Sequence, residues 1–134
     1  AQLMYAYAES TAPRIAVITG GAIGTGAAAM ASRPAADMIY AWPGSVISPM
    51  GAPAAVQLLY KKELHEAADP AAKRAELENK YRLEVADGLN AAVAGLVDDV
   101  IAPSTTRKAI AQALSMLAGK RVQRPAKKHG NLPL

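Results

Sequence analysis

The sequence predicts an α/β domain whose strands pair mostly in parallel. Short, continuously apolar segments end in glycine or proline, and each is followed by a segment with helical character. Such uninterrupted apolar runs are typical of parallel strands that are buried on both faces. The composition, with 51% hydrophobic and 19% charged residues in a chain of 134, also excludes a disordered or fibrous protein.

The first half of the chain is predicted to contain three strands and two helices. Residues 2–9 have a helical pattern without a capping residue, and an apolar run that predicts a strand follows at 15–19. The small residues 27–31 favour a helix. The next apolar segments, 38–42 and 46–47, are predicted as a second strand and a short third strand, separated by a proline–glycine pair.

The second half is predicted to be mainly helical. Pro53 fits the first turn of a helix, where its missing N–H costs no hydrogen bond. Asp69 is expected to cap a charged amphipathic helix that begins at Pro70 and runs towards Val85. The remaining expected elements are a short helix at 87–96 that Gly95 ends, a strand at 97–102, and a helix at 105–118 that Ser104 caps and Gly119 follows.

This set of strands is small for a sheet that is apolar on both faces. Three or four short strands supply few neighbours for one another and leave apolar edges without cover. We therefore expect the chain to be the C-terminal part of a longer domain, or a subunit that another chain completes. Residues 1–120 are expected to belong to that domain, and residues 121–134 to form a basic, extended tail.

The positive charge is concentrated near the C-terminus. Five of the fifteen Lys and Arg residues lie within residues 120–134, where none of the eleven Asp and Glu residues occurs. Without these five, ten basic residues remain against eleven acidic ones, so the domain itself has no basic excess. No zinc-finger spacing or RNA-binding aromatic motif is present either, and we do not expect nucleic-acid binding.

The chain contains no cysteine and no apolar run of the roughly 18 residues that a membrane-spanning helix needs. The lack of cysteine excludes disulfide scaffolds and thiolate metal sites. The two histidines, His65 and His129, are far apart in the sequence. We expect a soluble, cytoplasmic protein without a metal centre and without direct membrane insertion.

Residues 20–26, with the sequence GGAIGTG, are predicted to form a glycine-rich turn that leads from a strand into a helix. The N–H groups at a helix start have no intrahelical acceptor and, with the helix dipole, stabilise an anion or a developing oxyanion. The glycine spacing matches neither the dinucleotide-binding motif nor a Walker A loop. At this stage, a turn that only packs a helix against a sheet explains the pattern equally well.

Six segments together resemble the carboxyltransferase subunits of biotin-dependent acyl-CoA carboxylases and decarboxylases. This family includes the propionyl-CoA and methylcrotonyl-CoA carboxylase β subunits, transcarboxylase, and the methylmalonyl-CoA and glutaconyl-CoA decarboxylase α subunits. The matching segments follow in order GGAIGTGAAAM, AADMIYAWP, VISPMGAPAAVQLLYKKEL, LVDDVIAP, TRKAIAQALSML and KHGNLPL. The resemblance implies a crotonase-like spiral fold, with this chain as the latter part of the second of two such domains.

The resemblance also implies a reaction with two oxyanion holes and no essential side-chain base. Carboxybiotin gives up CO2, backbone N–H groups stabilise the resulting biotin enolate, and the biotin nitrogen exchanges a proton with the α-carbon of the acyl-CoA substrate. The family's second-domain hole matches Gly24, Thr25 and Gly26, which we expect to be catalytic. The residues expected to bind biotin are these three and Ala27, Ala28, Met50 and Gly51.

Two departures from the family pattern leave the acyl group open. Many members have an aromatic and a basic residue before the paired glycines, where this chain has Ile23 and Gly21. A polar or acidic residue is common after the Met50-Gly51 pair, where this chain has Ala52-Pro53. We therefore expect a biotin pocket of different shape.

The implied partners are the rest of the same subunit, further copies in a dimer-based oligomer that reaches a hexamer, a biotin carrier, and either biotin carboxylase or membrane decarboxylase subunits. Two other functions stay open. One is a non-catalytic crotonase-like subunit that completes another chain. The other is an enoyl-CoA hydratase-like enzyme, although no carboxylate suited to acid–base catalysis is visible beside the glycine-rich turn.

Five further residues are interpreted without a catalytic role. Trp42 is expected to end a strand and pack in the core, and His65 to lie on the surface. Asp98 and Asp99 are adjacent on a predicted strand, so their side chains point to opposite faces and cannot act together on one ligand. His129 belongs to the tail, which is expected to dock on a neighbouring subunit.

Overall fold

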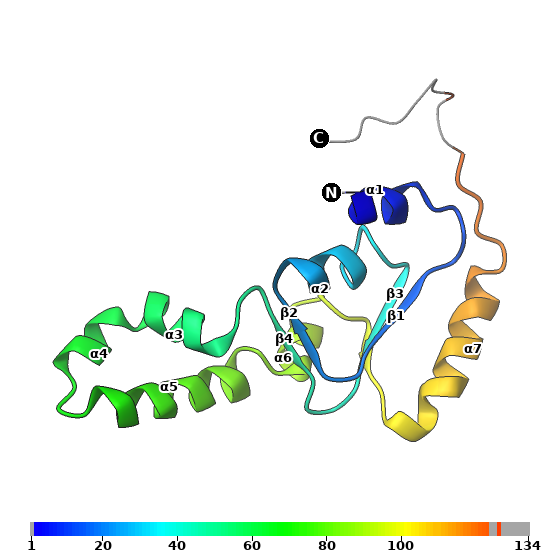
Figure 1. The fold of residues 1–134 in the computed structure, drawn as a ribbon. Helices are drawn as coiled ribbons and strands as arrows, with labels where there is room; N and C mark the ends of the chain where they lie inside the picture. The colour runs from blue at the N-terminus through cyan, green and yellow to red at the C-terminus, as the bar shows by residue number, and fades with distance from the viewer. Residues whose placement is uncertain (1, 124–125, 127–134) are drawn as a thin grey trace.

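The computed structural model describes residues 2–123 and 126 and consists of two small parallel sheets with helices around them (Figure 1). A 3-10 helix at Pro103–Thr105 precedes the last α-helix. None of the helices in the described part of the chain combines the length and apolarity needed to cross a bilayer. The elements are, in order, α1 (Gln2–Glu9), β1 (Ile15–Ile18), β2 (Gly21–Ile23), α2 (Gly24–Met30), β3 (Met38–Ala41), β4 (Val46–Ser48), α3 (Ala52–Leu59), α4 (Lys61–Glu66), α5 (Pro70–Glu84), α6 (Gly88–Val93), β5 (Asp99–Val100) and α7 (Thr106–Leu117).

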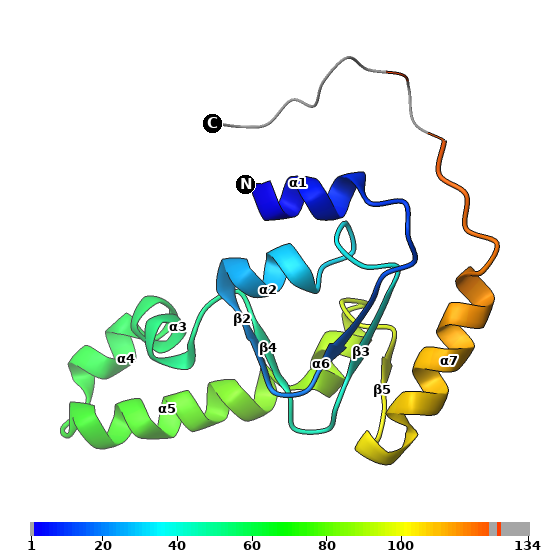
Figure 2. The same cartoon turned by 45° about the vertical axis from the view of Figure 1, so that its right-hand side comes forward.

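The two sheets are connected twice. One sheet has the strand order β1-β3-β5 and the other pairs β2 with β4, and every pair is parallel. β1 leads into β2 through residues 19–20, and β3 leads into β4 through residues 42–45. Helix α2 lies above the strands with α1 over it, and α7 covers the far side of the β1-β3-β5 sheet (Figure 2).

Both faces of the β1-β3-β5 sheet are buried, as its apolar runs predict. On one face, Ile39 and Ala41 of the central strand β3 are fully buried in a cluster with Ile18. On the other face, Tyr40 packs with Ala113 of α7. The prediction of strands covered on both sides is therefore confirmed for this sheet.

Helices α3, α4 and α5 form an arm that projects away from the sheets (Figures 1 and 2). The arm has its own small core of Ala52, Ala55, Val56, Leu77, Tyr81 and Ala86. Asp69 caps α5 as predicted, because its Oδ1 accepts hydrogen bonds from two N–H groups of the first turn at 3.0 and 3.1 Å.

The predicted turn at residues 20–26 is wrong in its first part. Residues Gly21–Ile23 form strand β2, which pairs with Val46–Ser48, and the helix begins at Gly24 rather than at residue 27. Gly21 disfavours a strand, but the pairing with β4 and the burial of Ala22 stabilise it. The described part of the chain thus contains five strands, whereas the sequence predicted three or four.

Three predictions near the C-terminus also need correction. The strand expected at 97–102 is limited to Asp99–Val100. Ser104 does not cap α7, because the chain enters this helix through a 3-10 turn and Thr105, the residue before it, already has helical dihedral angles. A side-chain cap needs an extended residue at that position. Gly119 follows the helix as expected but has no positive φ, unlike Gly95, which ends α6 with a φ of 72°.

Candidate functional site

The start of α2 lies beside the segment that connects β4 to α3. Strands β2 and β4 are parallel neighbours in which Ile23 is opposite Ser48, and each strand is followed by a helix. A Cβ atom placed on Gly24 would lie 3.8 Å from the carbonyl oxygen of Pro49. The glycine-rich segment and the Met50–Gly51 segment, which are 25 residues apart in the sequence, therefore meet at one edge of the β2-β4 sheet.

The first turn of α2 presents backbone N–H groups. Gly24 has a φ of +73°, a conformation that L-residues rarely adopt, and it turns the chain from β2 into the helix. The N–H of Gly24 belongs to the β2-β4 ladder, because Ile23 pairs with Ser48 and Pro49 has no N–H that could make this pairing instead. None of the turn, loop, cap and side-chain hydrogen bonds among the described residues uses the N–H of Thr25 or Gly26. Gly24 is half-buried, whereas Thr25 and Gly26 are exposed. The N–H groups of Thr25 and Gly26 can donate to an anionic oxygen beside them.

A cavity of about 400 Å³ lies between the two junctions. Gly24, Ala27 and Ala28 line it from one side, and Ser48 and Pro49 line it from the other. The lining contains no Asp, Glu or His residue. The cavity therefore offers small, mostly apolar walls and backbone donors, but no carboxylate or imidazole for acid–base catalysis.

Four of the predicted site residues, Thr25, Gly26, Met50 and Gly51, do not line this cavity. The side chain of Met50 packs against the core of the arm. Gly51 is the N-cap of α3, with a φ of −64° that any residue can adopt. Their segment therefore lies near the site, but the Met50 side chain packs in the arm and Gly51 has no side chain to contribute.

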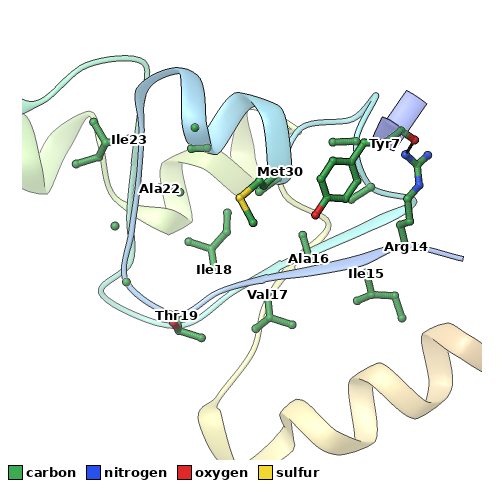
Figure 3. A pocket seen from close by; sticks show the side chains of 17 residues that line it. Tyr7, Arg14, Ile15, Ala16, Val17, Ile18, Thr19, Ala22, Ile23 and Met30 are labelled. Atoms are coloured by element: carbon green, nitrogen blue, oxygen red, sulfur yellow. Dashed lines mark hydrogen bonds between the residues drawn. The ribbon is translucent and has the colours of Figure 1, made fainter. Parts of the chain in front are cut away.

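A second cavity of about 490 Å³ lies on the other side of α2 and is drawn in Figure 3. Gly26 and Ala27 line it together with strands β1 and β2. Ala16 and Ile18 point towards α2, whereas Ile15 and Val17 point away towards α7 (Figure 3). The first turn of α2 therefore separates two cavities, which sequence reasoning did not predict.

The charged residues that the sequence singled out lie outside the first cavity. Asp98 accepts hydrogen bonds from the Ile39 N–H at 2.7 Å and from Arg33 at 2.6 Å, in agreement with a structural role. Asp99 and His65 are exposed, and His65 lies on the arm. A charged residue that the sequence analysis did not single out, Arg33, does line the cavity, and it forms an ion pair with Asp98. His129 lies outside the described residues.

Trp42 follows β3 and packs in the core, as expected. It lies against the cluster that contains Tyr40, and its Nε1 donates a hydrogen bond to Thr106 Oγ1 at 2.9 Å. It does not contribute to the lining of either cavity.

Two buried hydroxyl groups beside the site were missed by the sequence analysis. Ser48 Oγ lies 2.7 Å from the hydroxyl oxygen of Tyr81, which comes from α5, and donates to the Met50 carbonyl oxygen at 2.8 Å. Because 33 residues separate Ser48 from Tyr81, no local pattern in the sequence connects them.

Comparison with known proteins gives a match over almost the entire chain. A family model described as carboxyl transferase domain matches residues 1–132. The methylmalonyl-CoA decarboxylase α subunit of Propionigenium modestum is 45% identical over 135 residues, which are 100% of this chain and 26% of that protein. The methylmalonyl-CoA carboxyltransferase 12S subunit of Propionibacterium freudenreichii subsp. shermanii is 47% identical, over 99% of this chain and 26% of that protein.

Solved structures match equally well. The crystal structure of transcarboxylase 12S, described as a hexamer assembly with methylmalonyl-coenzyme A and methylmalonic acid bound, superposes with a TM-score of 0.90 at 46% identity, over 99% of this chain and 26% of that one. The β subunit of geranyl-CoA carboxylase from P. aeruginosa has the same fold, with a TM-score of 0.72 at 22% identity. These matches confirm the expected crotonase-like α/β fold. This chain spans about a quarter of the length of its relatives.

Proposed function

Because this chain belongs to the carboxyl transferase domain family, we propose that it takes part in carboxyl transfer between carboxybiotin and an acyl-CoA, and that its Gly24–Gly26 turn is the oxyanion hole on the biotin side. The observation that carries this proposal is the pair of Thr25 and Gly26 N–H groups at the start of α2, which no turn, loop, cap or side-chain hydrogen bond among the described residues uses, close to a cavity without acid–base side chains. Backbone donors are suited to a reaction that needs charge stabilisation rather than a side-chain base.

The residues of the turn fit a biotin ring. Gly24 lets the backbone approach a ligand without a Cβ atom in the way, and Ala27 and Ala28 leave room beside it. Bound carboxybiotin supplies the transferable carboxyl group and a basic nitrogen. The N–H groups of Thr25 and Gly26 would then donate hydrogen bonds to an oxygen on which negative charge develops, while Gly24 holds the turn in place through its pairing with β4. Each such donor is worth about 3–4 kcal/mol of transition-state stabilisation.

The acyl-CoA side of the reaction is assigned to residues beyond this chain. The relatives are about four times as long and carry names that refer to methylmalonyl-CoA and propionyl-CoA. We infer that the complete subunit supplies the CoA-binding half, assembles into an oligomer and receives biotin from a carrier protein or domain.

A non-catalytic assembly role is the second candidate, and one observation favours it. Among the described residues, β1 is at the edge of its sheet and β2 has one paired neighbour, so both strands leave one edge open. Open edges of this kind pair with further strands. A hydratase-like activity has less support, because the lining of the first cavity contains no carboxylate.

A carboxyl-exchange assay of the complete subunit tests the proposal. With methylmalonyl-CoA as donor and free biotin or a biotinylated carrier as acceptor, we expect propionyl-CoA and carboxybiotin to form in equal amounts. Gly24→Pro should abolish this transfer but retain acyl-CoA binding, because proline removes an N–H and cannot adopt a φ of +73°. A wild-type subunit that assembles but transfers no carboxyl group to biotin would support the assembly role instead, and normal turnover of Gly24→Pro would refute the assignment of the site.

A further inference from the structure

The segment that lies next to Gly24 at the first cavity is attached to the arm by a chain of two hydroxyl groups. Ser48 Oγ donates its single proton to the Met50 carbonyl oxygen at 2.8 Å. The contact of 2.7 Å between Ser48 Oγ and the Tyr81 hydroxyl must therefore be a hydrogen bond that Tyr81 donates. Donation therefore runs from Tyr81 of α5 to Ser48, and from Ser48 to the Met50 carbonyl oxygen in the segment 49–51.

Both hydroxyl groups are shielded from water. Ser48 is 8% exposed and Tyr81 is 4% exposed, and the ring of Tyr81 packs within the core of the arm. Water cannot easily replace either partner, so removal of one hydroxyl leaves the other buried and unpaired. Such a pair holds its neighbours in one position more strictly than an exposed contact does.

The segment that this pair holds forms one wall of the candidate site. Ser48 and Pro49 line the first cavity opposite Ala27 and Ala28. The carbonyl oxygen of Pro49 lies next to Gly24, since a Cβ atom there would be 3.8 Å away. Pro49 is exposed and has no N–H, and its carbonyl oxygen accepts none of the turn, loop or cap hydrogen bonds among the described residues. The bonds of Ser48 with Met50 therefore hold this segment on the β4 side, and a bond from the Ala55 N–H to the Gly51 carbonyl oxygen at 3.0 Å holds it on the α3 side.

We propose that Ser48 and Tyr81 are positioning residues for the biotin-side site, which fix the cavity wall that Ser48 and Pro49 form beside the Gly24 turn and couple this wall to the arm. This inference rests on the proposed function. Neither hydroxyl group is assigned to contact the substrate. A small displacement of a positioning segment reduces turnover strongly, because productive geometry tolerates less than about 1 Å of error.

The test uses the complete subunit, methylmalonyl-CoA as carboxyl donor and free biotin as acceptor. For Tyr81→Phe and for Ser48→Ala, we expect kcat/KM for biotin to fall about tenfold, while KM for methylmalonyl-CoA stays at the wild-type value. In the double variant, kcat/KM for biotin should fall no further than in either single variant, because the two hydroxyl groups act as one chain. Tyr60→Phe is the matched control, since Tyr60 packs against the same core and no hydrogen bond of its hydroxyl is recorded among the described residues.

The outcomes separate this inference from the proposed function. A wild-type subunit without any carboxyl transfer overturns both. A wild-type subunit that transfers normally, with both variants unchanged in kcat/KM for biotin, overturns the positioning role alone. The positioning role is also overturned if kcat/KM falls equally for biotin and for methylmalonyl-CoA in the two variants. It is likewise overturned if kcat/KM for biotin falls as much in Tyr60→Phe as in Tyr81→Phe. In either case the hydroxyl pair contributes only to general stability.

Discussion

The β2–α2 and β4–α3 junctions have the same topology but are stabilised in different ways. At the first junction, Gly24 turns the chain with a φ of +73° and no side chain caps the helix. At the second, the buried Ser48 and Tyr81 hydroxyl groups fix the segment before α3. The first junction thereby keeps its N–H groups available, and the second provides a fixed wall opposite them. A substitution that acts through backbone conformation should affect the first junction, and one that acts through side-chain packing should affect the second.

The largest effect is expected when the first junction is changed by Gly24→Ala. The new Cβ atom would meet the Pro49 carbonyl oxygen at an ordinary distance of 3.8 Å, so there is no clash. A φ of +73° is nevertheless strained for alanine by about 1–2 kcal/mol. The turn should relax and move its N–H groups, and loss of one oxyanion donor lowers kcat by about 10²–10³. We expect carboxyl transfer to biotin to fall by about 10², measured with the complete subunit.

Gly44→Ala is the matched control for this prediction. Gly44 also has a positive φ, of 77°, and no atom would lie within 4 Å of its Cβ atom. It lies in the connection before β4, at the opposite end of that strand from the site. The conformational penalty is thus the same, and transfer to biotin should be retained. Equal losses of transfer in the two variants would mean that strain alone, rather than the position of the donors, controls the activity.

Gly88→Ala should have the next largest effect, on stability, through the packing at the start of β4. Gly88 of α6 abuts the residue before β4, and its Cβ atom would lie 2.6 Å from Ser45 Oγ and 3.6 Å from the Ser45 carbonyl oxygen. Ser45 is 2% exposed and cannot move away. Overpacking of this kind costs about 1–3 kcal/mol. We expect the free energy of unfolding, measured with denaturant, to fall by that amount.

A second substitution identifies the clashing atom. Ser45 Oγ is buried without a hydrogen-bond partner among the described residues. Ser45→Ala alone should therefore leave stability unchanged or raise it slightly. Combined with Gly88→Ala, it should restore most of the lost stability, because the nearest remaining atoms would be 3.6 Å away or farther. A double variant no more stable than Gly88→Ala would contradict this explanation.

The same contrast explains which parts of the molecule could be predicted from the sequence. The continuous apolar runs at 15–19 and 38–42 identified β1 and β3, because burial on both faces leaves that pattern in the residues themselves. Asp69 and Gly95 marked helix ends through local hydrogen bonding and a positive φ. Each of these signals is contained in a few neighbouring residues.

The missed features all depend on residues that are distant in the sequence. Strand β2 contains a glycine and is stabilised by its pairing with β4, more than twenty residues later. Ser48 and Tyr81 meet only because the arm folds back on the sheet edge. The position of the glycine-rich segment at a helix start was predictable, whereas the wall opposite it was not. The unpredicted part of the site is thus the part made by tertiary packing.

The smallest effect, on the free energy of unfolding, is expected for Asp37→Asn. Asp37 lies far from both junctions, just before β3. Asp37 accepts hydrogen bonds from the Arg14 N–H at 2.7 Å and from Lys120 Nζ at 2.8 Å. It thereby attaches Lys120, which follows α7 by three residues, to the start of β3. Burial raises the pKa of the Asp37 carboxyl, but the hydrogen bonds and positive charges of Lys120 and Arg14 outweigh it, and the net pKa is lower than the usual 3.8.

A lowered pKa in the folded state fixes the direction of the pH effect. The ion pair contributes its full stabilisation above the unfolded pKa of 3.8 and loses it as the pH falls further, through the folded value. Asp37→Asn should remove this acid-dependent loss, together with at most about 1 kcal/mol of stability at neutral pH. Denaturant unfolding at pH 7 and pH 3 measures both. Carboxyl transfer to biotin at pH 7 should stay at the wild-type value, since this ion pair supports neither junction, and a loss of transfer in Asp37→Asn would show that the two ends of the sheet are coupled.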